Sequence, residues 1–164
     1  MRETDEYYMR MAIEQAKLAE EIGEIPIGAV VVYEPIDKAT RKPVADAEVI
    51  SQAHNLRETE KDPSAHAEFI AMLAASKALD AWRLTDCTVY VTLEPCIMCA
   101  GLMHQSRIAR CVFGASDQKA GALGTLYSIN ADERLNHRFD VIGGVCEEEC
   151  AALLTNFFKK KRNK

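Results

Sequence analysis

Residues 88–103 read TVYVTLEPCIMCAGLM, and this stretch decides the fold that the sequence predicts. Thr88 to Leu93 form a short, apolar and partly β-branched run that is typical of a central strand. Pro95 then opens a helix that begins at or next to Cys96 and runs to about Gln105, because proline loses no hydrogen bond at the first helical position. The stretch is therefore predicted to be a strand that leads directly into a helix.

The rest of the chain repeats this alternation. Apolar residues at helical spacing predict three more helices, from Thr4 or Asp5 to Gly23, from 64 to 79 and from 146 to 161. Short apolar runs predict four more strands, at 27–33, 49–53, 111–113 and 139–142. Strands alternating with helices predict an α/β fold, a three-layer α/β/α sandwich with helices flanking a central five-stranded mixed sheet.

One predicted connection between strands is unusually long and irregular. Residues 34–47 contain Pro35, Pro43 and several charges without periodicity, and the segment is longer than most hairpin loops. We interpret it as either a surface embellishment or a functional flap.

Length and composition limit the number of domains and the compartment. The 164 residues, 48% of them hydrophobic, suffice for one sizeable core, so a single domain over 1–164 is expected. The first residues lack the apolar core of a signal peptide, and no run is long enough to span a membrane. We expect a cytoplasmic protein without membrane contact. Its six cysteines are then reduced thiols, buried hydrophobes or metal ligands rather than a disulfide framework.

The charge is distributed unevenly. The net charge of −5 argues against a protein that coats nucleic acid nonspecifically. Residues 159–164 nevertheless hold five of the 20 lysines and arginines, so the remaining chain is more acidic than the average suggests. Such a basic end either reaches for phosphate or is a solvated, frayed terminus.

Cys96 and Cys99 lie three positions apart at a predicted helix start, which places both sulfurs on one side of the helix. The helix N-terminus favours the thiolate form that zinc requires. The same spacing also occurs in thioredoxin-like redox sites. His66 as third ligand would leave an open position for water, the arrangement of a catalytic zinc site. We therefore predict one Zn²⁺ per subunit, held by His66, Cys96 and Cys99.

Glu68 is the candidate catalytic residue. The triplet His66 to Glu68 is expected in the first turn of the helix that starts near Ser64, so Glu68 lies roughly 200° around the axis from His66 and should not bind the same ion. It can instead address the open side and carry protons between water, substrate and leaving group. His-x-Glu followed by Pro-Cys-x-x-Cys is the signature of zinc nucleobase deaminases.

Six stretches distributed along nearly the whole chain extend the likeness: IPIGAVVV, AHNLRETEKDPSAHAEFIAM, TVYVTLEPCIMCAGLM, SRIARCVFGASDQKAGALGTL, LNHRFDV and ECAALLTNFFKKKR. They resemble the bacterial tRNA-specific adenosine deaminases, which convert the wobble adenosine of an arginine tRNA to inosine. Cytidine, guanine and riboflavin-pathway deaminases share the zinc motif, but the last helix and the FGASDQKAGALGTL stretch resemble the tRNA branch. The resemblance implies a cytidine deaminase-like fold, a homodimer, and a tRNA anticodon stem-loop splayed so that the target base enters a pocket over the zinc.

The resemblance also implies substrate-binding residues. Asn55 would bond the flipped base, and the pocket wall would consist of Ile27, Ala67, Leu93, Glu94 and Pro95. From the sequence alone, the favoured interpretations are a turn residue for Asn55 and a core residue for Leu93.

Further contacts are implied outside the base pocket. Asp117 and Lys119 match a loop that touches neighbouring sugars and phosphates, although they are equally a charged surface turn. Asn136 and Arg138 match a run near the substrate, in which His137 is equally a structural histidine. Phe158 is expected either in the core or under an anticodon base, and Lys161 is expected to contact a phosphate of the RNA.

Two alternatives remain open. A deaminase of free guanine, cytosine or a nucleotide such as dCMP would need the same metal site and the same proton carrier. A noncatalytic zinc-binding or RNA-binding module would have no use for Glu68.

Overall fold

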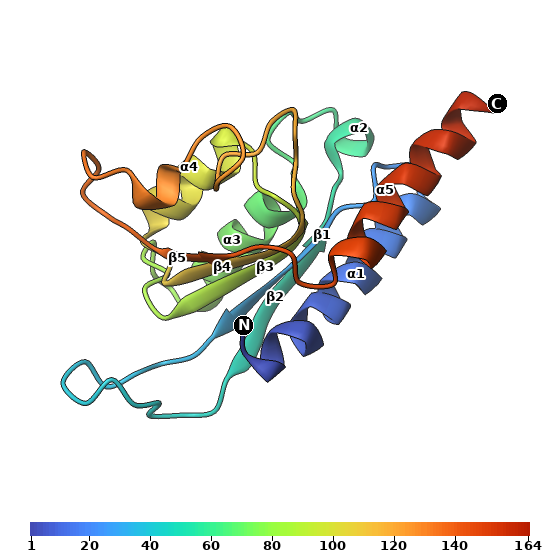
Figure 1. Cartoon of the computed structure of the whole chain (residues 1–164). Helices are drawn as coiled ribbons and strands as arrows, with labels where there is room; N and C mark the ends of the chain where they lie inside the picture. Colours follow the sequence, from blue (N-terminus) through green and yellow to red (C-terminus); the bar gives the residue numbers. More distant parts are fainter.

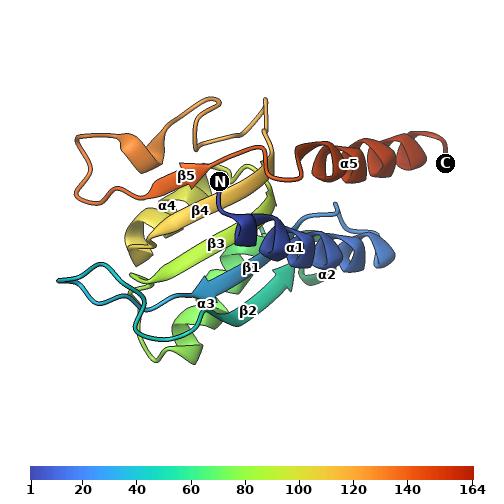
Figure 2. The same cartoon turned by 60° about the horizontal axis from the view of Figure 1, so that its bottom comes forward.

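The computed structural model describes residues 1–164, and its centre is a five-stranded mixed sheet in the order β2-β1-β3-β4-β5. Figure 2 shows the strands side by side in this order. The strands are β1 (Gly28–Tyr33), β2 (Glu48–His54), β3 (Cys87–Leu93), β4 (Arg110–Ala115) and β5 (Asp140–Ile142). β1 pairs antiparallel with both β2 and β3, whereas β3, β4 and β5 are parallel. The predicted mixed five-stranded sheet is confirmed.

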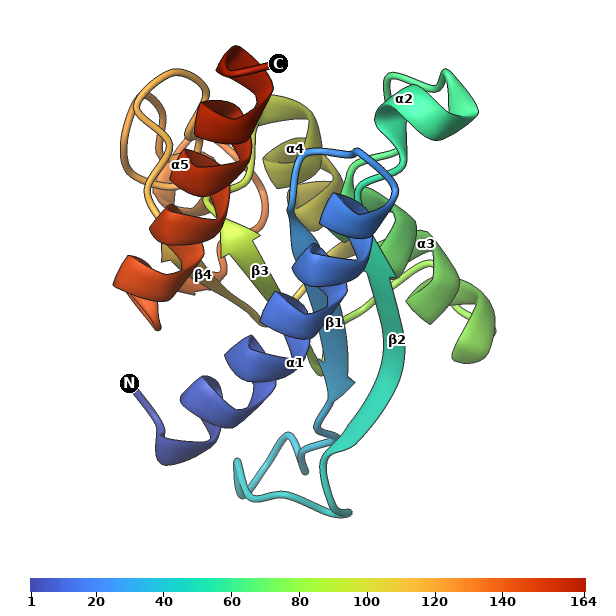
Figure 3. The ribbon, with the colours of Figure 1, turned by 90° about the vertical axis from the view of Figure 1, so that its right-hand side faces the viewer.

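Helices cover both faces of the sheet (Figures 1 and 3). The helices are α1 (Glu3–Glu21), α2 (Arg57–Glu60), α3 (Ala67–Ala78), α4 (Ile97–Ser106) and α5 (Glu147–Arg162), with a 3₁₀ turn, η1, at Ile129–Ala131. α1 and α5 lie on one face, and α3 and α4 lie on the other. The three-layer α/β/α sandwich is therefore confirmed. None of these helices combines the length and apolar character needed to cross a bilayer.

Two apolar cores fill the spaces between the layers. Alternate residues of β1 point to opposite faces, so Val30 and Val32 join the core under α1 and α5, while Ala29 and Val31 join the core under α3 and α4. Gly28 permits α1 to approach the sheet, because a Cβ there would lie 2.0 Å from the carbonyl oxygen of Ala12. The central strands are buried on both faces, which explains their nearly continuous apolar sequence.

Two local predictions need correction. The helix expected from residue 64 starts only at Ala67, and His66 is its N-cap, with φ −77° and ψ 148°. Asp62 accepts hydrogen bonds from the backbone and hydroxyl of Ser64 and so forms a turn ahead of the helix instead of capping it. The short helix α2 was not expected, because four residues are too few for an apolar periodicity.

The long connection 34–47 projects from the end of the sheet where β1 finishes (Figure 1). A bridge between Ile36 and Pro43 narrows it. Tyr33 pairs with Cys87 at the start of β3, so this segment lies at the edge opposite the carboxyl end of β3.

A buried polar cluster ties α1 to the sheet. The Arg110 guanidinium donates to both carboxylate oxygens of Asp5, with 2.8 Å from Nη1 to Oδ1, and the Tyr90 hydroxyl donates to the same carboxylate at 3.0 Å. Asp5 is fully buried. We call Asp5, Tyr90 and Arg110 the anchor cluster.

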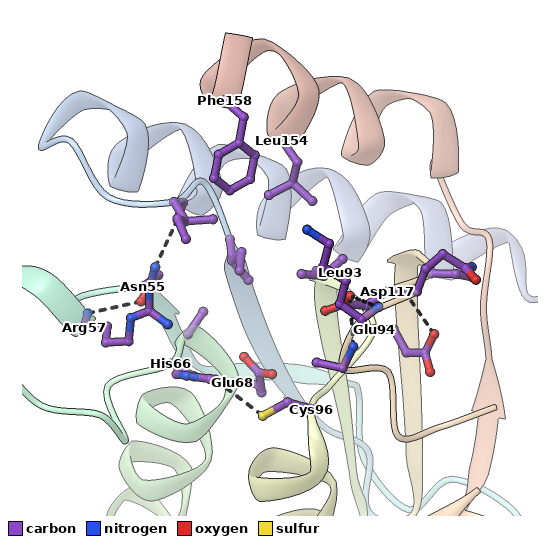
Figure 4. A pocket seen from close by; sticks show the side chains of 17 residues that line it. Asn55, Arg57, His66, Glu68, Leu93, Glu94, Cys96, Asp117, Leu154 and Phe158 are labelled. Atoms are coloured by element: carbon purple, nitrogen blue, oxygen red, sulfur yellow. Dashed lines mark hydrogen bonds between the residues drawn. The ribbon is translucent and has the colours of Figure 1, made fainter. Parts of the chain in front are cut away.

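The parallel strands also determine where a site can form. The carboxyl ends of β3 and β4 lie at the same edge, and the N-termini of α3 and α4 lie close to it (Figure 4). In open α/β sheets, ligands bind in the crevice beyond the carboxyl ends of the strands.

Candidate active site

His66, Cys96 and Cys99 meet at this edge and offer three metal-binding atoms within 4.8 Å of one another. His66 Nδ1 lies 3.6 Å from the Sγ of Cys96 and 3.6 Å from the Sγ of Cys99. Zinc bonds of about 2.0 Å to nitrogen and 2.3 Å to sulfur in a tetrahedron put ligand atoms about 3.5–3.8 Å apart. The three side chains therefore fit Zn²⁺, and with only three of them in the cluster one coordination position is left for water.

Local structure explains why these three side chains converge. His66 is the N-cap of α3, Cys96 is the N-cap of α4, and Cys99 lies in the first turn of α4. The positive ends of two helix dipoles thus point toward the cluster, which favours anionic sulfur.

The thiols are already polarised by their contacts. A hydrogen bond from Cys99, assisted by His66, lowers the pKa of Cys96 to about 4. The same bond raises the pKa of Cys99, and the contact with Cys96 raises the pKa of His66 although burial opposes it. One thiolate is thus favoured before any metal binds.

Glu68 lies in the first turn of α3 and is only 4% exposed. Burial is the largest influence on its carboxyl group and raises its pKa. It does not belong to the metal-binding cluster. It lines the cavity beside His66 and Cys96 (Figure 4). A carboxyl group with a raised pKa next to a metal site is suited to proton transfer near neutral pH.

A cavity of about 570 Å³ opens above the cluster (Figure 4). His66, Glu68 and Cys96 form its base, while Leu154 and Phe158 of α5 cover it from the other side of the sheet edge. The volume lies within the range of small-molecule and cofactor sites, which is about 300–1,000 Å³.

Most of the substrate-binding residues expected from the sequence line this cavity. They are Ile27, Asn55, Ala67, Leu93, Glu94, Asp117, Lys119 and Phe158. Pro95 lies between Glu94 and Cys96 but does not line the cavity, and its carbonyl accepts a hydrogen bond from Ala122 N–H at 2.9 Å. Lys161 is exposed, one turn of α5 beyond Phe158.

Asn136 and Arg138 lie elsewhere. Arg138 is exposed beside a second cavity that Arg107 also lines, near the amino ends of β4 and β5. Asn136 precedes it and is exposed. Within one chain these side chains are separated from the zinc-binding edge by the length of the parallel strands. His137 donates from Nε2 to the carbonyl of Ile108 at 2.9 Å, which is a structural hydrogen bond.

Two of the polar residues that line the cavity already bond to the chain itself. The amide of Asn55 donates to the carbonyl of Ile25 at 3.3 Å and accepts from Arg57 N–H at 3.1 Å, which fixes its orientation. Asp117 Oδ1 accepts from the backbone of Lys119 at 2.9 Å and of Ala120 at 3.2 Å. Each side chain retains capacity for a further hydrogen bond to a ligand.

Sequence reasoning missed several residues of the cavity. The residues not foreseen are Ile25, Arg57, Ser116, Gln118, Ala120 and Leu154. Arg57 follows Asn55 by two positions and adds a cation to the wall of the cavity. Leu154 lies four positions before Phe158 on α5, so helical spacing from Phe158 was the available signal.

Comparison with known proteins decides the family. The model of the cytidine and deoxycytidylate deaminase zinc-binding region matches residues 2–115. The chain is 50% identical over 160 residues to the tRNA-specific adenosine deaminase of Bacillus subtilis, covering 98% of this chain and 92% of that protein. The chain belongs to the tRNA-specific adenosine deaminase family.

Other tRNA-specific adenosine deaminases support this assignment. The Haemophilus influenzae protein is 46% identical over 98% of this chain and 86% of its own length. A solved structure from a study of A-to-I editing by tRNA:A34 deaminases at the wobble position of transfer RNA shows 36% identity and a TM-score of 0.79, over 90% of this chain and 99% of that chain. Family membership and the His-Cys-Cys cluster identify this tRNA-specific adenosine deaminase family member as a zinc-dependent hydrolytic deaminase with one Zn²⁺ site per chain.

The general zinc-binding region ends at Ala115, the last residue of β4. It therefore contains the metal ligands and Glu68. The loop with Asp117 and Lys119 and the helix with Phe158 lie outside it but within the stretch shared with the tRNA-specific adenosine deaminases.

Proposed function

We propose that this protein hydrolyses the 6-amino group of adenosine at the wobble position of a tRNA anticodon, releasing ammonia and leaving inosine, with tRNA-Arg as substrate. One observation carries the proposal. The metal-binding cluster and the buried Glu68 form the base of a cavity whose rim comes from residues beyond the general zinc-binding region, and those residues are part of the full-length match to tRNA-specific adenosine deaminases.

Glu68 is the proton carrier in this proposal. Bound zinc supplies a Lewis acid that activates water for attack on C6 of adenine. Glu68 takes one proton from the attacking water and delivers it to N1 of the ring, and it then takes the second proton from the same oxygen and delivers it to the departing amine. Its raised pKa matches both directions of transfer. Water and adenosine are thereby converted to inosine and ammonia without any further reactant.

Residues of the cavity wall and of its rim hold the RNA in this proposal. Asn55 offers its remaining amide capacity to the purine edge, between Ile27 and Leu93. Phe158, 40% exposed at the mouth of the cavity, is placed for stacking on a base. Arg57, Lys119 and the basic end of α5 with Lys161 supply cations for phosphates. Splaying a base out of a single-stranded loop costs less than extracting it from a duplex.

We further propose that the chain is a single deaminase domain that works as a cytoplasmic homodimer. The large apolar side chains of Ile97, at the start of α4, and of Leu126 and Tyr127, in the connection after β4, are more than half exposed, which favours a surface that a second subunit covers. All six cysteines are free, in keeping with a reducing compartment. In such a homodimer, Asn136 and Arg138 of one subunit would contact RNA bound at the cavity of the other subunit.

The decisive experiment offers purified protein an anticodon stem-loop with adenosine at the wobble position, the same stem-loop in deoxy form, and free adenine, adenosine, guanine and cytosine derivatives. Inosine in the RNA and released ammonia are measured. We expect rapid deamination of the RNA stem-loop alone. Faster turnover of a free base or nucleotide would favour the alternative, a small-molecule deaminase acting on guanine, cytosine or dCMP.

Two variants refine the recognition part of the experiment. Removing residues 159–164 should weaken binding of the stem-loop and flatten its salt dependence, by about 0.7 in log-log slope for each lost phosphate contact. Asp117→Asn should narrow the gap between RNA and DNA substrates, because a carboxylate accepts a hydrogen bond from the 2′-hydroxyl that only RNA has. An unchanged salt slope in the truncated protein and an unchanged RNA preference in Asp117→Asn would indicate that other residues recognise the RNA.

A further inference from the structure

Glu94 is a buried acid at the edge of the active-site cavity that the proposed chemistry does not use. Its side chain is 2% exposed, and none of the salt bridges in the protein involves it. A buried carboxyl group without a cation nearby is costly unless its oxygens find hydrogen-bond donors.

Those donors all come from one loop. The backbone N–H groups of Asp117, Leu123 and Thr125 donate to the two carboxylate oxygens of Glu94, at 3.2, 3.1 and 3.1 Å. The Thr125 hydroxyl donates to Oε1 as well. A dashed line in Figure 4 marks the bond from Asp117. The Glu94 carboxylate thus accepts hydrogen bonds from residues near both ends of segment 116–125, which we call the rim loop.

Gly121 shows how closely the rim loop passes. A Cβ at this position would lie 2.3 Å from Oε2 of Glu94 and 2.6 Å from the carbonyl oxygen of Asp117. Any larger residue would push the loop and the carboxylate apart. The neighbouring backbone reinforces the contact, because Ala122 N–H donates to the carbonyl of Pro95 at 2.9 Å.

The rim loop carries one wall of the cavity. Its members Ser116, Asp117, Gln118, Lys119 and Ala120 line that wall, whereas Glu94 is followed directly by Pro95 and the zinc ligand Cys96. The same carboxylate therefore fixes the wall relative to the segment that holds the metal.

We propose that Glu94 is a positioning residue, whose carboxylate holds the rim loop in its binding conformation and so determines affinity for the nucleotides beside the target base. This inference rests on the proposed function for its substrate. A wall that is already ordered loses little conformational entropy when RNA binds, whereas a loosened wall must be ordered by the RNA itself. Glu94 acts through the loop and therefore affects binding more than chemistry.

Glu94→Gln is the principal test, because it keeps the size of the side chain but replaces one acceptor oxygen with an NH₂ group that faces N–H donors. We expect KM for the RNA stem-loop to rise about tenfold with kcat within about twofold, since each side chain that binding must order costs affinity. Zinc content should be unchanged. Hydrogen exchange measured by mass spectrometry should accelerate in peptides that cover residues 116–125.

Three further variants separate positioning from general stability. Thr125→Val removes the hydroxyl donor and should reproduce the KM effect in weaker form, whereas Thr125→Ser keeps the donor and should restore wild-type KM. Asp132→Asn is the matched control, because the Asp132 carboxylate bonds only to Arg134 within its own turn. It removes the same charge and should leave both KM and rim-loop exchange unchanged.

The inference is overturned if exchange in the rim loop stays at the wild-type rate in Glu94→Gln, or if Glu94→Gln and Thr125→Val lower kcat at constant KM. The exchange measurement needs no substrate. Failure of the wild-type protein to deaminate the stem-loop would therefore overturn the proposed function separately from the positioning role of Glu94.

Discussion

Asp5 and Glu68 are both buried acids, one on each face of the sheet, yet their protonation is driven in opposite directions. Asp5 is a buried residue in the first turn of α1, and its pKa is lowered. Glu68 lies at the start of α3 on the other face, and its pKa is raised. Burial alone raises the pKa of both. The difference therefore comes from what each carboxylate contacts.

The anchor cluster supplies Asp5 with partners. Burial raises its pKa, but hydrogen bonds from the Arg110 guanidinium, the Arg2 backbone and the Tyr90 hydroxyl together lower it further than burial raises it. The Glu68 carboxylate has no salt bridge and faces a cavity. An acid whose hydrogen-bonding capacity is used by the fold stabilises the fold, whereas an acid left with free capacity remains available for chemistry.

Removing a metal ligand should produce the largest effect on the active-site side of this comparison. We expect Cys96→Ala to lose zinc and to fall below detectable turnover, because a thiolate ligand cannot be replaced by a methyl group. Metal analysis and single-turnover assays measure both. Cys111→Ala, at a buried cysteine outside the cluster, should retain a full complement of zinc. A zinc-loaded, active Cys96→Ala protein would refute the ligand assignment.

Glu68→Gln should remove the chemistry while leaving the fold intact. The amide keeps the shape of the side chain but cannot carry protons, so we expect a loss of about 10⁴-fold in the single-turnover rate, at the upper end for general acid-base catalysis. Zinc content and the melting temperature should equal or exceed those of the wild type, because an acid that is costly to bury has been neutralised. A rate within tenfold of wild type would assign the proton transfers to another group.

Asp5→Asn should show the opposite pattern. It leaves the buried Arg110 guanidinium without its counter-charge, and breaking a buried pair costs about 3–5 kcal/mol of unfolding free energy. Turnover per folded, zinc-loaded molecule should remain at the wild-type level. Denaturant unfolding compares it with the double variant Asp5→Leu/Arg110→Met, which should recover part of the loss. Normal stability with impaired turnover would reverse the roles of the two clusters.

Lowering the pH should produce the smallest of these effects, a change in the free energy of unfolding. Because the folded pKa of Asp5 is lowered, its contribution to stability is complete above the unfolded value of about 3.9 and is lost as pH falls through the folded value. The stability difference between wild type and Asp5→Asn should be constant from about pH 5 to 7 and shrink below about pH 4. Unfolding curves at several pH values measure it, and a constant difference down to about pH 2 would contradict the lowered pKa.

The sequence predicted the proximity of the three cluster residues with unequal strength along the chain. Cys96 and Cys99 share one helical turn, so their spacing alone placed both sulfurs together. His66 is 30 residues from Cys96, and only a motif match joined it to them. The helical argument that separated Glu68 from His66 started from a wrong premise, because His66 is an extended N-cap residue. Glu68 lies outside the metal cluster all the same, since the chain enters the helix between the two residues.

The sequence by itself determined the five strands, the four longer helices, their order along the chain and the Cys-x-x-Cys half of the metal site. These features depend on hydrophobic periodicity, on residue spacing and on residues that end a helix or strand, all within a few turns of chain. Tertiary structure alone decided the direction in which the pKa of each buried acid shifts, the anchoring of the rim loop to Glu94 and the distance of Arg138 from the cavity. Asp5 meets Arg110 across 105 residues and Glu94 meets Thr125 across 31. Such pairs are brought together by packing of the sheet and its helices, which no local pattern specifies.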